Sequence, residues 1–238
     1  MESLEPLLVV QEHDLALDRL RHRHATLPER DQFAAAAADV RALDAEIEQR
    51  RPPLAELARN EARYEDEAQK LSGQADAANA KLYSGEITSP KELQALQADV
   101  DQLRRHQAAV EEQAIAVMEE REPLEADLAA LLARRAARSE DLTAAEATLA
   151  VAVASFDAEI AAEQVVRDES AAGLDAPIVA LYERCRANSS SRVGAARLVG
   201  HTCQGCHLTI PATEVDALRK APPGTIAHCD NCGAILVP

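Results

Sequence analysis

The chain has 238 residues, of which 47% are hydrophobic but only 2% aromatic, with no Trp, two Phe and three Tyr. Its apolar content is mostly Ala, Leu and Val, which favours long helices over a compact globular core. The formal net charge is −16, with 36 acidic and 19 basic residues before Ala171 but five acidic and six basic residues from there on. A strongly acidic body repels phosphate backbones and anionic membranes, so any nucleic-acid contact is expected in the C-terminal part.

The sequence predicts a cytoplasmic protein that does not associate with membranes. Residues Met1–Glu5 contain no basic n-region, and no stretch approaches about 18 consecutive apolar residues. Four of the five cysteines fall in two C-x-x-C pairs, and no export signal precedes them. In a reducing compartment this pattern indicates a bound metal rather than a disulfide framework.

Leucines near the N-terminus predict a first amphipathic helix, and Thr26–Glu29 reads as a break before the next helix. Two longer series of apolar residues then repeat every seven positions. One series runs through Val40, Ile47 and Leu54, and the other runs from Leu96 to Leu131. Such heptads are typical of a coiled-coil seam. We expect two long antiparallel helices, with residues 4 to 27 packed along residues 148 to 170.

Helix stop and start signals separate the two series. Gly85 suits the left-handed residue that closes a helix, Ser89 is a good N-cap, Pro90 fits the first helical position, and Glu92 completes a capping box. The chain therefore reverses here, which predicts a helical hairpin with its tip near residues 83–90.

The tip contains an aromatic and an aliphatic side chain where a plain connection needs only Gly and polar residues. Tyr83 and Ile87 are therefore candidate anchors for a protein partner. The alternative is that they staple the two helix ends to each other.

Three prolines predict a bend partway along the hairpin. Pro52 and Pro53 precede the tip by about as many residues as Pro123 follows it, and proline removes a backbone hydrogen bond and kinks a helix. Aligned breaks would give a shared bend; the alternative is that each proline kinks its own helix independently.

The two cysteine pairs predict one structural Zn²⁺. Cys203 and Cys206 are separated by 22 residues from Cys229 and Cys232. Each pair can present two sulfurs from one tight turn, and four thiolates form the closed tetrahedral arrangement of structural zinc sites. Folding of this segment is expected to depend on the metal. Short strands near 197–201, 225–228 and 234–237 predict a zinc ribbon.

Other metal chemistries fit the cysteines less well. A rubredoxin-type iron site is expected to have aromatic residues around it, and a redox C-x-x-C is expected beside a βαβ pattern. A catalytic zinc needs an open coordination position. The sequence contains none of these features. The nearby His201, His207 and His228 are expected to be bystanders, and Cys185 is expected to be a small buried residue rather than a reactive thiol.

The predicted fold is mainly α, a long antiparallel coiled-coil hairpin followed by a small β zinc ribbon. We divide the chain into a hairpin at 1–172, a short helix and linker at 173–196, and the ribbon at 197–238.

The sequence resembles a bacterial family of C4-type zinc-ribbon proteins with an N-terminal coiled-coil hairpin. The resemblance covers nearly the whole chain, and its most specific parts are the tip and the ribbon. The matching segments are Leu7–Gln11, Leu82–Gly85, Ser89–Gln97, Leu181–Arg184, Cys203–His207 and Cys229–Leu236. The chain departs from the family in its Ala-rich approach to the ribbon at Leu174–Pro177, and in Ala234, where relatives often carry a basic residue.

The resemblance implies a non-enzymatic protein. Some relatives are tied to flagellar or type III secretion systems as chaperone-like adaptors that engage a sigma factor, a secretion ATPase or RNA. For this chain we expect an adaptor that binds a protein partner. The alternative is nucleic-acid binding by the ribbon through its basic residues, which the near-neutral local charge and the lack of stacking aromatics disfavour. These basic residues are Arg192, Arg197, Arg219 and Lys220.

Overall fold

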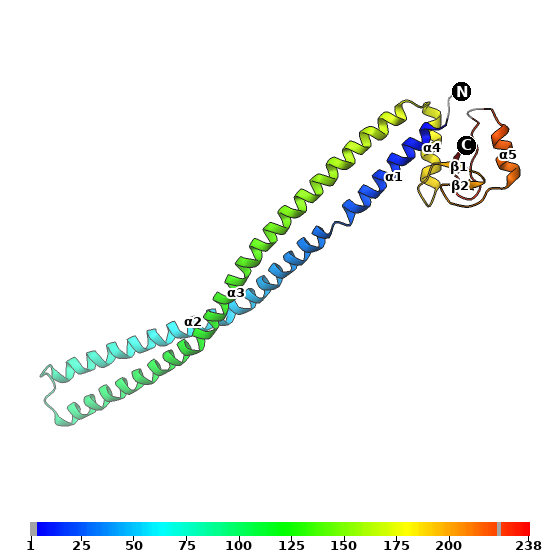
Figure 1. Ribbon diagram of the computed structural model, residues 1–238. Helices are drawn as coiled ribbons and strands as arrows, with labels where there is room; N and C mark the ends of the chain where they lie inside the picture. The colour runs from blue at the N-terminus through cyan, green and yellow to red at the C-terminus, as the bar shows by residue number, and fades with distance from the viewer. Residues whose placement is uncertain (1–3, 223–224) are drawn as a thin grey trace. The chain divides into compact units, whose positions relative to one another are not determined.

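The computed structural model describes residues 4–222 and 225–238 (Figure 1). The acidic start at Met1–Ser3 lies outside these residues. The chain forms two compact units, one made of residues 33–145 and the other of residues 1–32 and 146–238. The helices are α1 (Pro6–Ala25), α2 (Pro28–Tyr83), α3 (Pro90–Ala172), α4 (Ala176–Asn188) and α5 (Ala212–Lys220), and the strands are β1 (Ala195–Val199), β2 (Thr202–Cys203) and β3 (Ile235–Val237).

Unit 33–145 is the antiparallel hairpin that the heptads predict. Its two helices run side by side in Figure 1 and meet through separate apolar clusters along their length. Leu43 and Ile47 of α2 pack on Leu131 of α3, and Leu71 packs on Val110 nearer the tip. All five side chains are less than 9% exposed. The heptad positions therefore form the buried seam, and the predicted helical hairpin is confirmed.

The prolines do not interrupt the helices. Both α2 and α3 continue through them as helix. Ile47 packs on Leu131, and the Arg121 guanidinium forms an ion pair with the largely buried Glu61 carboxylate. All three prolines lie between these two contacts, in the same interval of the hairpin. The hairpin is bent (Figure 1), and the assignment of the bend to the prolines stays a prediction.

The turn lies where the sequence places it. Helix α2 ends at Tyr83, Gly85 has a φ of 77°, and α3 begins at Pro90. Glycine suits this turn because it adopts positive φ without the steric cost that a side chain incurs.

In the other unit, α1 packs along the C-terminal part of α3. Nδ1 of His13 lies 2.7 Å from a carboxylate oxygen of Glu163, and the Arg21 guanidinium donates to Gln164 at 3.1 Å. The guanidinium of Arg23 stacks over the Phe156 ring, 4.9 Å from its centroid. These contacts confirm the predicted pairing of residues 4–27 with 148–170.

The ribbon contains a three-stranded sheet in the order β2–β1–β3. Strand β1 pairs antiparallel with β2 and parallel with β3. The expected strand at 225–228 is wrong: His228 forms an isolated bridge with Ile235, and the Leu236 amide donates to the Ala227 carbonyl at 2.8 Å, a pairing too short to make a strand. Helix α5, which follows Pro211, was not predicted from the sequence.

The two faces of this sheet belong to different cores. Ala196, Leu198 and Leu236 face the cluster that contains the zinc-site cysteines. The alternate residues Ala195, Ile235 and Val237 face a second cluster, to which α1, the end of α3 and α4 contribute Leu7, Val10, Ala171 and Tyr182. Period-two alternation along the strands separates the two sets. The sheet therefore joins the zinc-site core to the helical core of its unit.

Candidate metal centre

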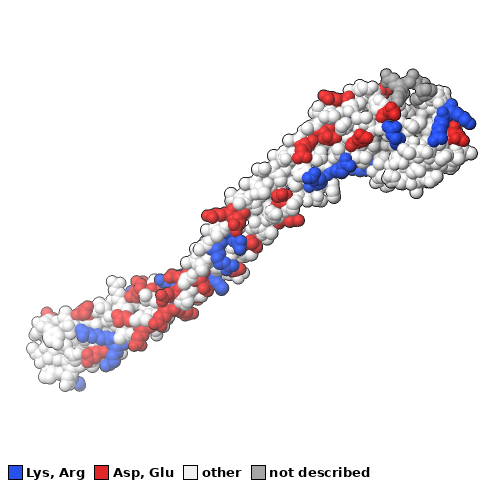
Figure 2. Space-filling view, in the orientation of Figure 1, with Lys and Arg blue, Asp and Glu red and all other residues white. Residues whose placement is uncertain are grey.

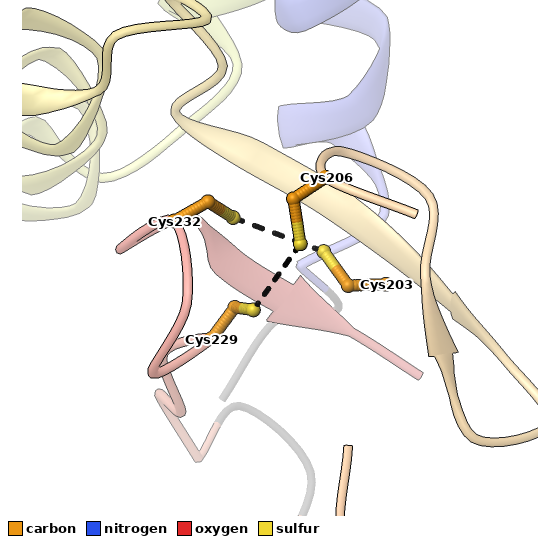
Figure 3. A group of neighbouring side chains, drawn as sticks. All are labelled: Cys203, Cys206, Cys229 and Cys232. Atoms are coloured by element: carbon orange, nitrogen blue, oxygen red, sulfur yellow. Dashed lines mark hydrogen bonds between the residues drawn. The ribbon is translucent and has the colours of Figure 1, made fainter. Parts of the chain in front are cut away.

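Four sulfurs converge in the ribbon (Figure 3). The Sγ atoms of Cys203, Cys206, Cys229 and Cys232 all lie within 4.8 Å of one another. Cys203 and Cys232 are 3.9 Å apart, and Cys206 and Cys229 are 3.8 Å apart. A tetrahedral zinc with Zn–S bonds of about 2.3 Å separates its sulfurs by about 3.8 Å. The predicted ligand set thus has the spacing that one structural Zn²⁺ requires.

The two cysteine pairs have the same backbone geometry. In the first, the amide of His207 donates to the Cys203 carbonyl at 2.8 Å; in the second, the amide of Gly233 donates to the Cys229 carbonyl at 2.7 Å. The residue after each pair has positive φ, 60° at His207 and 75° at Gly233. Glycine adopts this conformation freely, whereas His207 does so at a steric cost.

Gly205 lies close to its neighbours inside the first pair. A Cβ at this position would lie 3.0 Å from Ala196 Cβ and 3.0 Å from Val193 Cγ1. These contacts are tighter than most real Cβ contacts, so the first turn lies directly against β1 and the residues that precede it. The small residue lets the cysteines approach the sheet.

Burial and amide hydrogen bonds act in opposite directions on the thiols. Burial raises the pKa of Cys203 above its ordinary value and that of Cys232 to about 12. At Cys229 burial also opposes ionisation, but the hydrogen bonds from the amides of Cys232 and Asn231 and from the Cys232 and Cys206 thiols together outweigh it and lower the pKa. Without a cation, four clustered sulfurs cannot all ionise readily. Zn²⁺ supplies the positive charge that holds them as thiolates.

The side chains near the cysteines do not complete another metal site among the described residues. Nδ1 of His228 lies 3.3 Å from the Gly233 carbonyl and 3.7 Å from Cys185 Sγ, so it faces away from the four sulfurs toward these partners. Cys185 is partly buried against the helical core. Burial raises the pKa of its thiol, which is the opposite of what a reactive thiolate needs.

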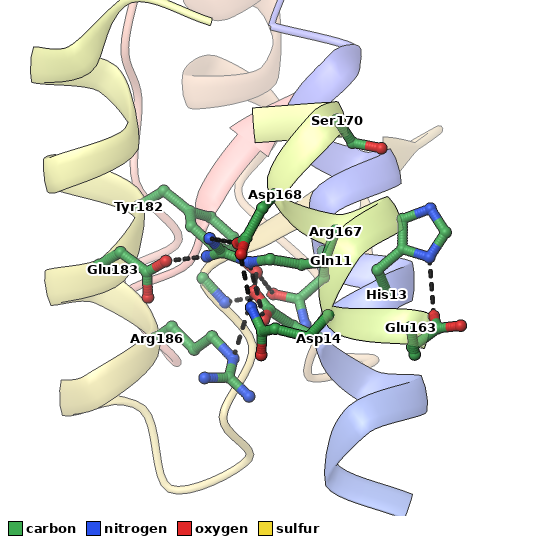
Figure 4. A network of polar contacts seen from close by, with 12 residues as sticks. Gln11, His13, Asp14, Glu163, Arg167, Asp168, Ser170, Tyr182, Glu183 and Arg186 are labelled. Atoms are coloured by element: carbon green, nitrogen blue, oxygen red, sulfur yellow. Dashed lines mark hydrogen bonds and ion pairs between the residues drawn. The ribbon is translucent and has the colours of Figure 1, made fainter. Parts of the chain in front are cut away.

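A buried polar network lies where α1, α3 and α4 meet the ribbon (Figure 4). Asp14, only 4% exposed, accepts a 2.5 Å hydrogen bond from the hydroxyl of Tyr182 and a 3.2 Å bond from the Arg167 guanidinium. Arg186 lies 3.6 Å from the same carboxylate and donates to Asp18 at 2.6 Å. Cations from two helices thus compensate the carboxylates of α1.

Gln11 links this network to the sheet. Its side-chain oxygen accepts hydrogen bonds from the amides of Gly194 at 2.5 Å and Ala195 at 3.3 Å. A Cβ at Gly194 would lie 2.7 Å from both the ring and the carbonyl of Tyr182, so the chain leading into β1 contacts α4 directly.

Gln11, Asp14 and Tyr182 were not predicted from the sequence to have a role. A signal was present, since Gln11 and Asp14 lie between Leu7 and Leu17 on the buried face of α1. Polar residues on an apolar face usually have buried partners.

The four basic residues proposed for nucleic-acid binding have separate surroundings. Arg192 lies 3.3 Å from Asp18, and Arg197 lies 3.4 Å from Glu5. Arg219 donates to the Gly200 carbonyl at 3.1 Å, and Lys220 is exposed at the end of α5. Arg192 thus pairs with a carboxylate of α1, and Arg197 with the residue that precedes α1.

At the tip, the two candidate anchors differ. Tyr83 is 78% exposed, whereas Ile87 is partly buried. Of the five aromatic residues, all within the described part of the chain, only Tyr83 is exposed. This exposure disfavours the interpretation that Tyr83 staples the helix ends.

Acidic side chains are spread along the visible face of the helical hairpin rather than gathered in one place (Figure 2). Such carboxylates are a solvated helix surface. No helix in the described ranges is both long and apolar enough to cross a bilayer.

Comparison with known proteins agrees with this architecture. A family model for the CT398-like coiled coil hairpin domain matches residues 10–190, and one for a C4-type zinc ribbon domain matches residues 202–236. An uncharacterised protein of Mycobacterium tuberculosis is 33% identical over 231 residues, which are 97% of this chain and 93% of that protein.

Two solved structures share the fold. One, from Mycobacterium smegmatis, is 28% identical with a TM-score of 0.87 and full coverage of both chains. CT398 from Chlamydia trachomatis is 19% identical with a TM-score of 0.68, covering 98% of this chain and 96% of that one. The hairpin, the ribbon with its four-sulfur site and the family models together show that the chain belongs to the CT398-like family of coiled-coil hairpin proteins with a C4-type zinc ribbon.

Proposed function

We propose that this protein is a non-catalytic adaptor that binds a protein partner through the tip of its hairpin. The observation that carries the proposal is Tyr83, which is 78% exposed at the end of α2 in a chain with only five aromatic residues. Exposed tyrosines are enriched among the residues that dominate binding energy at protein interfaces.

The residues of the tip form a small, ordered surface that a partner can contact. Ile87 lies partly buried in the same connection, and Ser84, Gly85 and Glu86 between them are exposed. The hydroxyl of Ser84 accepts a hydrogen bond from the Glu86 amide at 3.2 Å and donates to the Lys81 carbonyl at 2.9 Å. These bonds order the loop before any partner binds, which lowers the entropic cost of association.

The role of the zinc site in this proposal is structural. Four thiolates leave no open coordination position for a substrate or water. The ion stabilises the ribbon, and the ribbon's sheet packs against the helical core.

Photo-crosslinking from the tip tests the proposal. A photoreactive phenylalanine analogue replaces Tyr83 in one variant and Lys70, an exposed residue of the same helix, in the control variant. We expect a discrete protein adduct from position 83 and none from position 70. Excess wild-type protein should compete for it, whereas excess Tyr83→Ala/Ile87→Ala protein should not.

Circular dichroism separates anchoring from folding. The double variant should keep the wild-type helicity. Lost helicity with intact competition would contradict the proposal. RNA binding that weakens steeply between about 50 and 200 mM salt, and that charge reversal at Arg192, Arg197, Arg219 and Lys220 abolishes, would instead support the nucleic-acid alternative.

A further inference from the structure

The ribbon contains a cavity separate from the zinc site. It has a volume of about 520 Å³ and lies among α5, strands β1 and β3, and residues of 225–230. We call it the ribbon pocket. Its apolar lining includes Leu198, Ile210, Val215, Leu218 and Leu236.

The apolar lining belongs to the core that encloses the zinc-site cysteines. Leu198, Ile210, Val215 and Leu236 are each less than 9% exposed, and they cluster with Cys203 and Cys229. One side of this core therefore borders a cavity instead of protein. The volume falls in the range of sites that bind ligands.

Apart from His228, the ionisable side chains at the pocket are carboxylates. Glu214, in the first turn of α5, and Asp230, between Cys229 and Cys232, both line it. No Lys or Arg occurs among its lining residues in the described part of the chain. Of the neighbouring cations of α5, Arg219 donates instead to the Gly200 carbonyl. The carboxylates repel phosphate groups and favour a ligand that carries Lys or Arg.

Ile226, in sequence between the lining residues Thr225 and Ala227, is 41% exposed. A polypeptide with a bulky apolar side chain in the pocket and a basic residue beside it matches both the lining and the charge.

We propose that the ribbon pocket binds a basic, amphipathic peptide segment of a protein partner, with a bulky aliphatic or aromatic side chain inserted between α5 and the sheet. This site is independent of the hairpin tip, because all its residues lie in the unit formed by residues 1–32 and 146–238. A negative result at the ribbon pocket therefore does not contradict the proposed binding at the tip, and the reverse also holds.

Phage display on the zinc-loaded full-length protein tests the proposal with a random peptide library as the probe. We expect enriched peptides to combine a bulky apolar residue with a neighbouring Lys or Arg. The affinity of the protein for a selected peptide is then measured by fluorescence anisotropy. Ala217→Phe, which fills the pocket from an exposed lining position, should weaken this affinity by at least about tenfold. Glu214→Lys should weaken it about two- to fivefold.

Matched controls lie on the same helix. Ala212→Phe and Asp216→Lys change exposed residues of α5 that do not line the pocket, and they should leave the affinity unchanged. All variants should retain one zinc per chain, which verifies that the ribbon is folded.

Three results would overturn the proposal. One is enrichment of peptides without the apolar and basic pair. Another is equal binding to the Ala217→Phe and wild-type proteins. The third is self-association of the wild-type chain that Ala217→Phe abolishes, which would make the occupant a second copy.

Discussion

The Tyr182 hydroxyl donates a 2.5 Å hydrogen bond to the Asp14 carboxylate, and 168 residues separate the two in sequence. Tyr182 is fully buried and Asp14 is 4% exposed. This bond ties α1 to α4 next to the sheet, inside the network that also contains Arg167 and Gln11. It is a direct link between the first helix of the chain and the segment that precedes the ribbon.

Removing this hydroxyl should destabilise the unit. Tyr182→Phe leaves the ring in place but takes one donor from a buried carboxylate, which should lower the free energy of unfolding by about 1.5–3 kcal/mol. Thermal denaturation of the zinc-loaded protein measures the change. Tyr83→Phe, at the exposed tip, is the control and should have no effect. Equal stability of the two variants would show that the bond contributes nothing net.

Alkaline pH should reduce the contribution of Tyr182. Burial, reinforced by the hydrogen bond to Asp14, raises the pKa of Tyr182 above its ordinary value of 10. The stabilisation is therefore complete below pH 10 and is lost as the pH rises above it, because the unfolded tyrosine ionises first. The stability difference between wild type and Tyr182→Phe should shrink by about 1.4 kcal/mol at pH 11 relative to pH 8. An unchanged difference in denaturation experiments at the two values would contradict this.

Two glycine substitutions should have opposite effects. Gly194→Ala forces a Cβ to within 2.7 Å of the Tyr182 carbonyl and ring, so it should destabilise by about 1–3 kcal/mol. Gly73→Ala, in the middle of α2 with nothing within 4 Å of the new Cβ, should stabilise its helix by about 0.5–1 kcal/mol. Denaturant titration of both variants measures these changes, and a stabilised Gly194→Ala protein would mean that the backbone there shifts at little cost.

Removing zinc should destabilise the first turns of α1 as well as the ribbon. Strand β3 presents Ile235 and Val237 to Leu7 and Val10 of α1, and it follows directly on the second cysteine pair. Chelation, or Cys229→Ser, should therefore increase hydrogen exchange in β1, β3 and the first turns of α1. Amides of residues 33–145 should retain their protection and most of the helical circular dichroism signal should persist. Unchanged exchange in α1 would show that the helical core holds without the ribbon.

The sequence predicts the repetitive parts of this fold well. Heptads identify the seam from Val40 to Leu131 because each position repeats the same environment, and the cysteine spacing identifies the metal ligands because a C-x-x-C turn is a local structure. The turn residues Gly85 and Pro90 likewise carry their own conformational preferences.

Long-range pairings are harder to infer. The partners of Asp14 come from α3 and α4, and nothing local in α1 specifies them. Helix α5 was missed because nine residues contain no heptad, although Glu214 in its first turn and Arg219 and Lys220 in its last fit the helix dipole. The ribbon pocket depends on how α5 packs on the sheet, which no local pattern encodes.

Because both faces of its sheet are buried, the ribbon is poorly suited to transfer into another protein as an independent domain. A ribbon transplanted alone would carry Ala195, Ile235 and Val237 as an apolar face exposed to water, although its zinc ligands were complete. A new host would need a matching set of helices, or the recipient would aggregate through that face. The ribbon and the helices that pack on it, α1, the end of α3 and α4, are therefore expected to have been inherited together, with substitutions in β3 compensated in α1 and α4.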